Sequence, residues 1–325
     1  MCIFLYNIKE DYKRKRVYKM VSTQKKSLYK SILEYKFIYL MLLPGILFLL
    51  VFKYIPMYGI QLAFKDFMLN KGISGSPWIG LDNFSYIWGE PEFWSAFGNT
   101  IIISFLKLLI GFPFPVVLAI LINEYKCEKY KKFLQVIYTF PHFLSWVIVS
   151  GIMFNLLSNN GALNNLISSM GFDKINFLIN KSTFRMLLVS TGIWKEAGWG
   201  TIIYLAAIAG INPSLYEAAT VDGASRWQKI IHITWPGIRN IVILMFIMRV
   251  GHVMDVGFMQ VLNMYNPAVY EVADIIDTYI YRLTFERAVG FGISTAVGLF
   301  KGVTNLIFLL IANAISKKYK HSGIF

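Results

Sequence analysis

The chain has 325 residues, of which 56% are hydrophobic and only 15% charged, and its mean hydropathy is +0.53. Soluble domains carry about 25% charged residues, so this composition excludes an ordinary soluble protein and indicates one that lies in a lipid bilayer. The formal net charge is +14, but the basic residues gather in the N-terminal tail and in short loops, which argues against nucleic-acid binding.

The N-terminal tail, residues 1–36, contains ten of the 32 Lys and Arg residues and is expected to contact anionic membrane lipid. The first apolar run is too long for the core of a signal peptide and lacks a cleavage site, so we expect a retained membrane anchor. The pattern leaves open whether translation begins at Met1 or at Met20. Cys2 and Cys127 offer neither a disulfide framework nor metal-ligand spacing.

Six apolar segments are each long enough to cross a bilayer, because a transmembrane helix needs about 20 mostly apolar residues. Interior prolines such as Pro44 and Pro141 are compatible with these helices, since neighbouring helices satisfy the backbone groups that proline leaves free. The sequence therefore predicts an all-α, polytopic membrane protein with six transmembrane helices. In chain order the segments cover residues 37–58, 99–122, 133–157, 186–209, 238–260 and 291–315.

Lysine and arginine counts predict the orientation of these segments. The two tails and the two loops on their side of the membrane, 123–132 and 210–239, hold 20 Lys and Arg, whereas the three opposite loops hold seven. Cytoplasmic segments carry the excess of basic residues, so both termini are expected in the cytoplasm. The predicted domains are a basic tail over 1–36, a six-span domain over 37–315 and a C-terminal tail over 316–325.

Loop 59–98 separates the first two segments on the outer side. It is rich in turn residues and aromatics, among them Gly72, Pro77, Trp78 and Trp88. Such a composition favours a compact loop, and we expect a small folded cap on the outer face of the membrane domain.

The cytoplasmic loop 211–238 carries the clearest local signals. Asn212 followed by Pro213 is typical of a helix start, with an N-cap and a proline at the first helical position. A short helix should follow, and Gly223 permits a bend that other residues resist. A second surface helix is expected over 224–233, ended by a proline before the fifth span. Exposed apolar residues on these helices would need a partner.

This loop resembles the signature of inner-membrane permeases from binding-protein-dependent ABC importers. That signature is Glu-Ala-Ala, three residues, Gly, nine residues, and then Ile-x-Leu-Pro. Asp222 and Ala224 complete the Asp-Gly-Ala form that is common in sugar permeases. The signature is matched by Glu217-Ala218-Ala219, Gly223, Ile233 and Trp235-Pro236, with Trp in place of Leu.

The resemblance extends over most of the chain. Residues 78–84 look like the Gly-Leu-x-Asn-Phe element of sugar permeases, and the arrangement is similar to the larger subunit of maltose-type importers. Lys65-Asp66-Phe67 and Gly198-Trp199-Gly200 are similar to segments of permeases for oligosaccharides derived from complex polysaccharides. The resemblance implies a type I ABC importer permease with a cytoplasmic coupling helix and with a carbohydrate as cargo.

In this family the loop docks into a cleft on the ATP-binding subunit, so the resemblance implies an ATPase-coupling site. Ala218 and Ala219 would let the helix approach closely, Glu217 would supply a charge for a salt bridge, and Asp222 and Gly223 complete the site. The chain has no Gly-x-x-x-x-Gly-Lys-Ser/Thr phosphate loop, so ATP and Mg²⁺ are expected on partner ATPase subunits and no cofactor in this chain. The implied partners are a second permease subunit in a heterodimer, a dimer of ATP-binding subunits and an extracytoplasmic solute-binding protein.

Charged residues inside predicted spans suggest function, because each costs about 2.5–3.5 kcal/mol to insert. They favour a translocation path in which aromatic rings stack on sugar faces and polar groups bind hydroxyls. The alternative is that the charges only pair with each other, or with the partner permease, to hold the bundle. The residues expected to form the path are Trp194, Glu196, Trp199, Tyr204, Arg249, Asp255 and Lys301.

Helical spacing groups further polar residues. Lys301 shares one face of the sixth segment with Ser294 and Asn305, and Ser104 shares a face of the second with Lys107. These faces should point into the bundle or into a water-filled cavity. His142 and His252 are expected to be hydrogen-bonded interior histidines.

Two other functions remain open. An ABC importer for amino acids, peptides or polyamines would share the coupling loop, although the Asp-Gly-Ala form and residues 78–84 favour sugar. An ion-driven secondary transporter could use the charged spans as a relay, but it would leave loop 211–238 unexplained. The sequence contains no nucleophile elbow and no metal-binding His pair, so neither an enzyme nor a metal site is expected.

Overall fold

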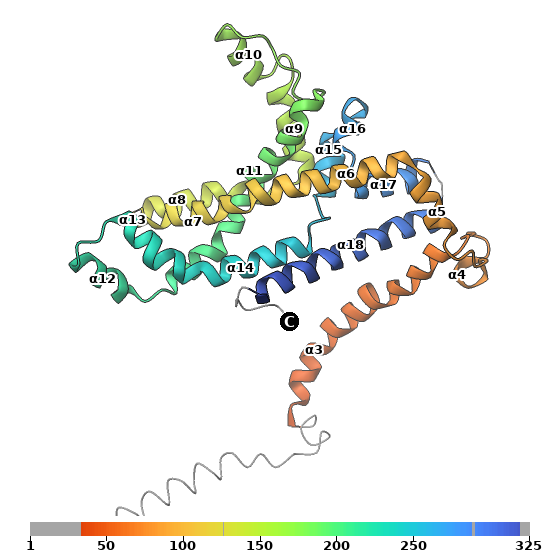
Figure 1. Cartoon of the computed structure of the whole chain (residues 1–325), viewed down its shortest axis with the longest axis horizontal. Coiled ribbons are helices and arrows are strands. Elements are labelled where there is room, and N and C mark those ends of the chain that lie inside the picture. Colours follow the sequence, from red (N-terminus) through yellow and green to blue (C-terminus); the bar gives the residue numbers. More distant parts are fainter. Residues whose placement is uncertain (1–33, 126, 288–289, 319–325) are drawn as a thin grey trace, which may run out of the picture. The chain divides into compact units, whose positions relative to one another are not determined.

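The structure is a computed structural model that describes residues 34–125, 127–287 and 290–318. It divides the chain into two compact units, Met1–Ile60 and Gln61–Phe325 (Figure 1). The predicted tails lie almost entirely outside the described residues.

Helices make up all the regular elements of the described residues. The one β contact among them is an isolated bridge between Lys65 and Trp78. The all-α prediction is therefore confirmed.

The described part of the first unit is helical, with α3 (Lys36–Leu49) followed by the π-helical η1 (Leu50–Tyr54). Neither element has a buried residue. The helix that includes them, Lys36–Phe64, contains an 18-residue stretch with a mean hydropathy of 2.2 and is long enough to cross a membrane. A helix that is apolar on all sides is stable only in a bilayer or against other apolar surfaces.

A small folded cap opens the second unit. After η2 (Ile55–Phe64) come α4 (Gly72–Gly75) and α5 (Asp82–Gly89). The side-chain amide of Asn83 ties them together by donating to the carbonyls of Ala63 and Lys65, at 3.0 and 3.1 Å. The predicted folded loop is confirmed, while its place on the outer side stays a prediction.

Long apolar helices form the body of the second unit. The elements α6 (Pro91–Leu106), η3 (Lys107–Gly111) and α7 (Pro113–Asn123) run as one helix of 33 residues. The last helix, α18 (Phe291–Lys318), packs beside α14 (Trp235–Gly251). Two further crossings would each be a bent pair of helices, which would bring the total among the described residues to six.

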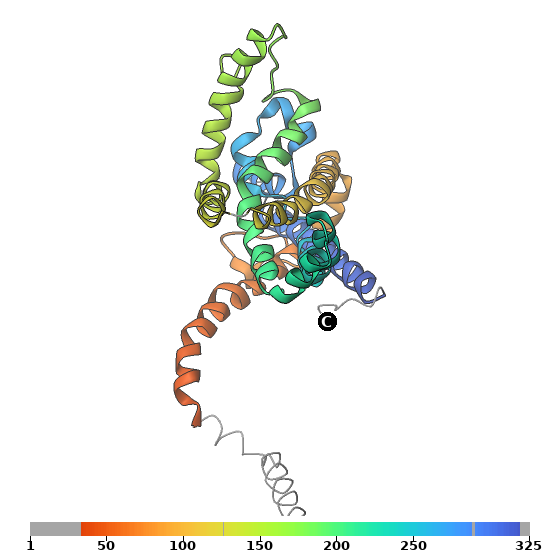
Figure 2. The ribbon, with the colours of Figure 1, turned by 90° about the vertical axis from the view of Figure 1, so that its left-hand side faces the viewer.

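The predicted third span, 133–157, is wrong as one continuous helix. The chain forms α8 (Glu128–Thr139) and η4 (Phe140–Phe143), then turns before α9 (Trp146–Leu157). The two parts meet at a bend of 101°. Ser145 is extended and its hydroxyl accepts a hydrogen bond from the Ile148 N–H at 3.3 Å, so it caps a new helix. Beyond α9, α10 (Ala162–Ser169) extends away from the other helices of this unit (Figures 1 and 2).

The predicted fourth span starts earlier than expected. Helix α11 (Lys181–Ala209) has 29 residues and packs against α7, α8 and α14. The Asn180 side chain caps its first turn by accepting from the Ser182 N–H at 3.0 Å. It is the central helix around which the cavities described below are arranged.

The predicted fifth span, 238–260, is wrong at both ends. Its helix begins at α13 (Arg226–Lys229), continues through the π-helical η5 (Ile230–Thr234), and ends with α14 at Gly251. Pro236 does not end a helix there, because it occupies the first turn of α14 after the π-helical segment. Residues 252–257 then form turns rather than a helix.

Short helices fill the stretch between the fifth and sixth spans. They are α15 (Phe258–Met264), η6 (Pro267–Val269), α16 (Tyr270–Ala273), α17 (Ile276–Tyr281) and η7 (Arg282–Glu286).

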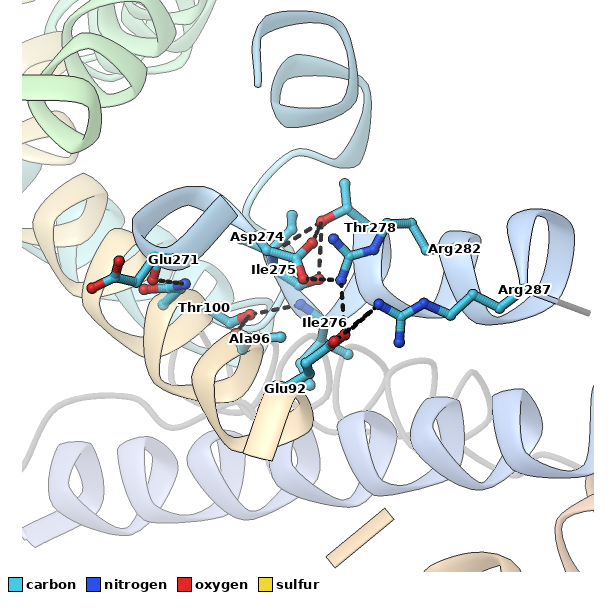
Figure 3. A network of polar contacts seen from close by, with 11 residues as sticks. Glu92, Ala96, Thr100, Glu271, Asp274, Ile275, Ile276, Thr278, Arg282 and Arg287 are labelled. Atoms are coloured by element: carbon cyan, nitrogen blue, oxygen red, sulfur yellow. Dashed lines mark hydrogen bonds and ion pairs between the residues drawn. The ribbon is translucent and has the colours of Figure 1, made fainter. Parts of the chain in front are cut away.

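A buried polar network holds this stretch against α6 (Figure 3). Arg282 donates to the Asp274 carboxylate at 2.5 Å, and the Thr278 hydroxyl donates to the same carboxylate at 2.7 Å. On α6, Glu92 pairs with Arg287 at 2.7 Å. Burial raises the pKa of the Asp274 carboxyl, while the Thr278 hydroxyl and the Arg282 guanidinium act in the opposite direction.

Candidate translocation site and coupling segment

A cavity of about 440 Å³ lies between α7, α11, α14 and residues 255–260. Most of its wall is apolar, with charged and aromatic side chains at intervals, which is typical of small-molecule sites. Its lining comprises Lys107, Gly111, Phe112, Pro115, Trp146, Val189, Gly192, Ile193, Glu196, Ala197, Trp199, Gly200, Ile203, Tyr204, Met245, Arg249, Asp255, Val256, Gly257 and Gln260.

Five of the seven residues predicted for the path line this one cavity, although they come from three segments of the chain. They are Glu196, Trp199, Tyr204, Arg249 and Asp255.

The other two predicted path residues lie elsewhere. Trp194 is half-exposed and is not part of the lining. Lys301 is also outside the lining, but its Nζ lies 2.6 Å from Oδ1 of Asp255, so it reaches the cavity through that carboxylate.

His142 contacts two residues of the cavity wall, Trp199 and Glu196, although the sequence did not predict it for the path. Its ring lies parallel to the Trp199 indole, and its Nδ1 is 2.7 Å from Oε2 of Glu196. Lys195 donates to the His142 carbonyl at 2.7 Å and lies 3.3 Å from Glu196. Lys195 and Glu196 therefore hold η4 against α11, and Glu196 also lines the cavity.

Gln260 is a second residue that the sequence did not reveal. It is fully buried, and its amide donates to the Leu188 carbonyl at 2.7 Å and to the Thr191 hydroxyl at 2.8 Å. Its Oε1 accepts from Lys107 Nζ at 2.5 Å. Gln260 therefore joins α15, α11 and η3 at the cavity wall.

The Gly-Trp-Gly segment of α11 has a steric explanation. A Cβ at position 198 would lie 1.8 Å from the Tyr138 carbonyl oxygen, so only glycine lets α11 and α8 approach this closely. A Cβ at position 200 would meet Pro115 of α7 at 3.3 Å. The two glycines bring neighbouring helices against α11 on either side of Trp199.

A larger cavity of about 830 Å³ is bounded by α7, α8 and α11. Its lining is almost wholly apolar, apart from groups such as Lys132 and Gln135. It has few polar groups that could bind sugar hydroxyls, so the smaller cavity is the better candidate for a path.

The predicted start and bend of the coupling segment are confirmed. Helix α12 (Pro213–Val221) begins at Asn212, whose side chain accepts from the Ser214 N–H at 3.1 Å. Gly223 has φ +77°, a conformation that favours glycine. The predicted second helix over 224–233 is instead the beginning of the continuous helix Arg226–Gly251.

The residues of the coupling motif lie on the surface of this segment. Glu217, Ala218, Asp222 and Gly223 are exposed and Ala219 is partly exposed. Figure 1 shows α12 and α13 at one end of the second unit and the cap helix α5 at the other.

Two side-chain contacts fix α12 to the following helix. The Tyr216 hydroxyl lies 2.9 Å from the Thr234 hydroxyl, and Lys229 donates to the Thr220 hydroxyl at 2.7 Å. Ser225 and Gln228 form a capping box between the two helices. The exposed motif is thus carried on a braced turn rather than on a loose loop.

Known proteins are similar to this chain in sequence and in fold. Residues 111–321 match the family described as binding-protein-dependent transport system inner membrane component. The polygalacturonan/rhamnogalacturonan transport system permease protein YteP of Bacillus subtilis (strain 168) is 44% identical over 303 residues, covering 93% of this chain and 94% of YteP.

Two solved structures are similar over nearly the whole chain. A crystal structure of a bacterial ABC transporter involved in import of the acidic polysaccharide alginate contains a chain with TM-score 0.82 and 44% identity, covering 90% of this chain and 99% of that one. A bacterial alginate ABC transporter in complex with an alginate pentasaccharide-bound periplasmic protein gives TM-score 0.83 and 42% identity, covering 92% and 100%. The chain therefore belongs to the family of inner membrane components of binding-protein-dependent transport systems, and it is a transport permease of the membrane rather than an enzyme.

Proposed function

We propose that this permease forms half of the translocation pathway of an ATP-driven importer and that its cargo is an oligosaccharide. The observation that carries the proposal is the cavity of about 440 Å³, where predicted path residues from separate segments meet. The relatives named for polygalacturonan, rhamnogalacturonan and alginate support a carbohydrate over amino acids, peptides or polyamines.

The chemistry of the cavity suits a sugar held briefly. Trp146, Trp199 and Tyr204 supply ring surfaces for the apolar faces of a sugar. Glu196 and Arg249 supply an acceptor and donors for hydroxyl groups. A mostly apolar wall with few polar groups would let the cargo move on rather than hold it tightly.

The coupling segment suits a docking role on ATP-binding subunits. An exposed short helix with Ala218 and Ala219 beside Glu217 presents small side chains and one charge on a braced support. In this proposal ATP and Mg²⁺ bind to a dimer of partner ATPase subunits, and a second permease completes the pathway. Both termini and the coupling segment lie in the cytoplasm, and a solute-binding protein delivers cargo from outside.

The test is cargo recognition by the assembled importer. The transporter is purified with its partner permease and ATPase subunits, and ATP hydrolysis is measured with its solute-binding protein loaded with galacturonate, alginate or arabinose oligosaccharides, or with amino acids. The proposal predicts that at least one oligosaccharide stimulates hydrolysis and that no amino acid does. Stimulation by amino acids alone would overturn the choice of cargo.

A further inference from the structure

Residues 252–257 form a non-helical break between α14 and α15, and this break lies beside the centres of two long helices. They contact Ser104 and Lys107, near the middle of Pro91–Asn123, and Lys301 and Asn305, near the middle of Phe291–Ile315. Irregular backbone at the depth of a bilayer is tolerated only where it is buried in protein or lines a cavity, because its polar groups need partners.

Neighbouring helices supply those partners. The Ser104 hydroxyl donates to the Val253 carbonyl. The Asn305 side-chain oxygen accepts from the Met254 N–H at 2.9 Å. On the cavity side, Lys107 donates to the Val256 carbonyl at 2.6 Å. The backbones of Val253, Met254 and Val256 are thus held by side chains that belong to other helices.

Charge pairing fixes the side chain of Asp255, the charged residue of the break that lines the cavity. Lys301 lies 2.6 Å from Asp255 and 2.8 Å from Asp277 on α17, so one ammonium joins two carboxylates. Asp255 lines the cavity and Lys301 does not. Lys301 therefore acts on the cavity by holding Asp255 in place.

The break is also where the helix from the coupling segment ends. That helix runs without interruption from Arg226 to Gly251, over 26 residues. At its far end it is braced to α12 by the Tyr216–Thr234 contact. A displacement of α12 would pass along this helix and reach the chain at 252–257.

We propose that Lys301 and Asn305 are positioning residues that make segment 252–257 a fixed joint between α14 and the cavity. Because segment 252–257 is held by these contacts, a movement of α14 shifts the residues that line the cavity. A flexible connection would bend instead and leave the cavity unchanged. The inference rests on the proposed function, since it assumes that movement of the coupling segment opens and closes this cavity.

The experiment follows access to the cavity in the assembled transporter without any cargo. A single reporter is introduced as Ile203→Cys in a chain with Cys2→Ser and Cys127→Ser. Its rate of reaction with a maleimide is compared between the nucleotide-free complex and the complex trapped with ATP and vanadate. We expect a several-fold difference for the parent reporter and for Lys301→Arg, which keeps the charge.

Lys301→Met removes the ammonium that joins Asp255 to Asp277 and leaves His252, 3.1 Å away, as the partner of Asp255. Asn305→Leu removes the acceptor of the Met254 N–H. We expect both to lose the nucleotide-dependent difference in complexes that still assemble and hydrolyse ATP. Lys181→Met, the matched control, removes the exposed ion pair with Glu271 and should keep the difference.

The inference is overturned if Lys301→Met and Asn305→Leu keep the parent's difference. It is also overturned if Lys301→Arg or Lys181→Met loses the difference as fully as they do. Because the readout needs no sugar, failure of the oligosaccharide assignment would leave its result unchanged.

Discussion

The imidazole of His142 lies flat on the indole of Trp199, with ring centroids 4.6 Å apart and planes 6° apart. The same imidazole reaches Glu196 through its Nδ1. One face of the indole is therefore already occupied within the chain, and the two carboxylate oxygens face His142 and Lys195. The contact also joins η4 to the part of α11 that lines the cavity.

Replacing Trp199 by Ala should slow transport. A stacked aromatic contact is worth about 0.5–1.5 kcal/mol, so the uptake rate should fall roughly two- to tenfold. Trp199→Phe should retain part of the rate. The measurement is initial uptake of the imported oligosaccharide per assembled complex.

Trp194→Ala is the matched control, because Trp194 is on the same helix but outside the cavity lining. It should transport at the unaltered rate. If Trp194→Ala and Trp199→Ala lose uptake rate equally, the position of Trp199 in the cavity lining does not explain its effect.

Two substitutions in the coupling segment should uncouple ATP hydrolysis from uptake. Gly223→Ala strains a residue with φ +77° by about 1–2 kcal/mol, and Glu217→Lys reverses an exposed charge. Both variants should insert in the membrane and lose uptake. Gly72→Ala in the cap carries similar strain at φ +65° and should transport normally. Normal uptake by both coupling variants would contradict the docking role.

Gly198→Ala should destabilise the permease. Its Cβ would lie 1.8 Å from the Tyr138 carbonyl, and relieving such a clash typically costs about 1–3 kcal/mol or more. Gly302→Ala in α18 has no atom within 4 Å of its Cβ and should be neutral or stabilising by up to about 1 kcal/mol. Thermal unfolding in detergent compares the two variants, and equal midpoints would disprove the close helix contact.

Removing Asp274 should destabilise the stretch between the last two spans. Asp274→Ala removes the closer carboxylate of buried Arg282 and leaves Glu92, 3.7 Å away, and the loss of one partner of a typical buried pair costs about 3–5 kcal/mol. Glu271→Ala breaks an exposed pair with Lys181 and should leave the stability nearly unchanged, because solvent screens such a pair. Denaturation of the purified permease measures both, and a mild Asp274→Ala effect would argue against a buried network.

Hydropathy and local signals predicted much of this fold because they act over short distances. Four of the six predicted spans, the first, second, fourth and sixth, lie within continuous helices in the structure. The Asn212 cap and the Gly223 bend are local features of backbone chemistry, and the structure shows both.

The interruptions escaped prediction because tertiary contacts stabilise them. The break after Gly251 is satisfied by Ser104 and Asn305, which lie far away in the sequence. Gly257 and the polar residues around it were the local signal in the sequence that could have indicated this break. His142 contacts the cavity residues Trp199 and Glu196 only because the bend before Ser145 places η4 against α11, an arrangement that an apolar run cannot reveal.

Uptake into proteoliposomes tests the central claim most directly. The complete transporter is reconstituted with its solute-binding protein outside and ATP inside, and accumulation of the labelled oligosaccharide is followed. The proposed function predicts accumulation that requires ATP, the ATPase subunits and the solute-binding protein together. Accumulation driven by an ion gradient without the ATPase subunits would contradict it.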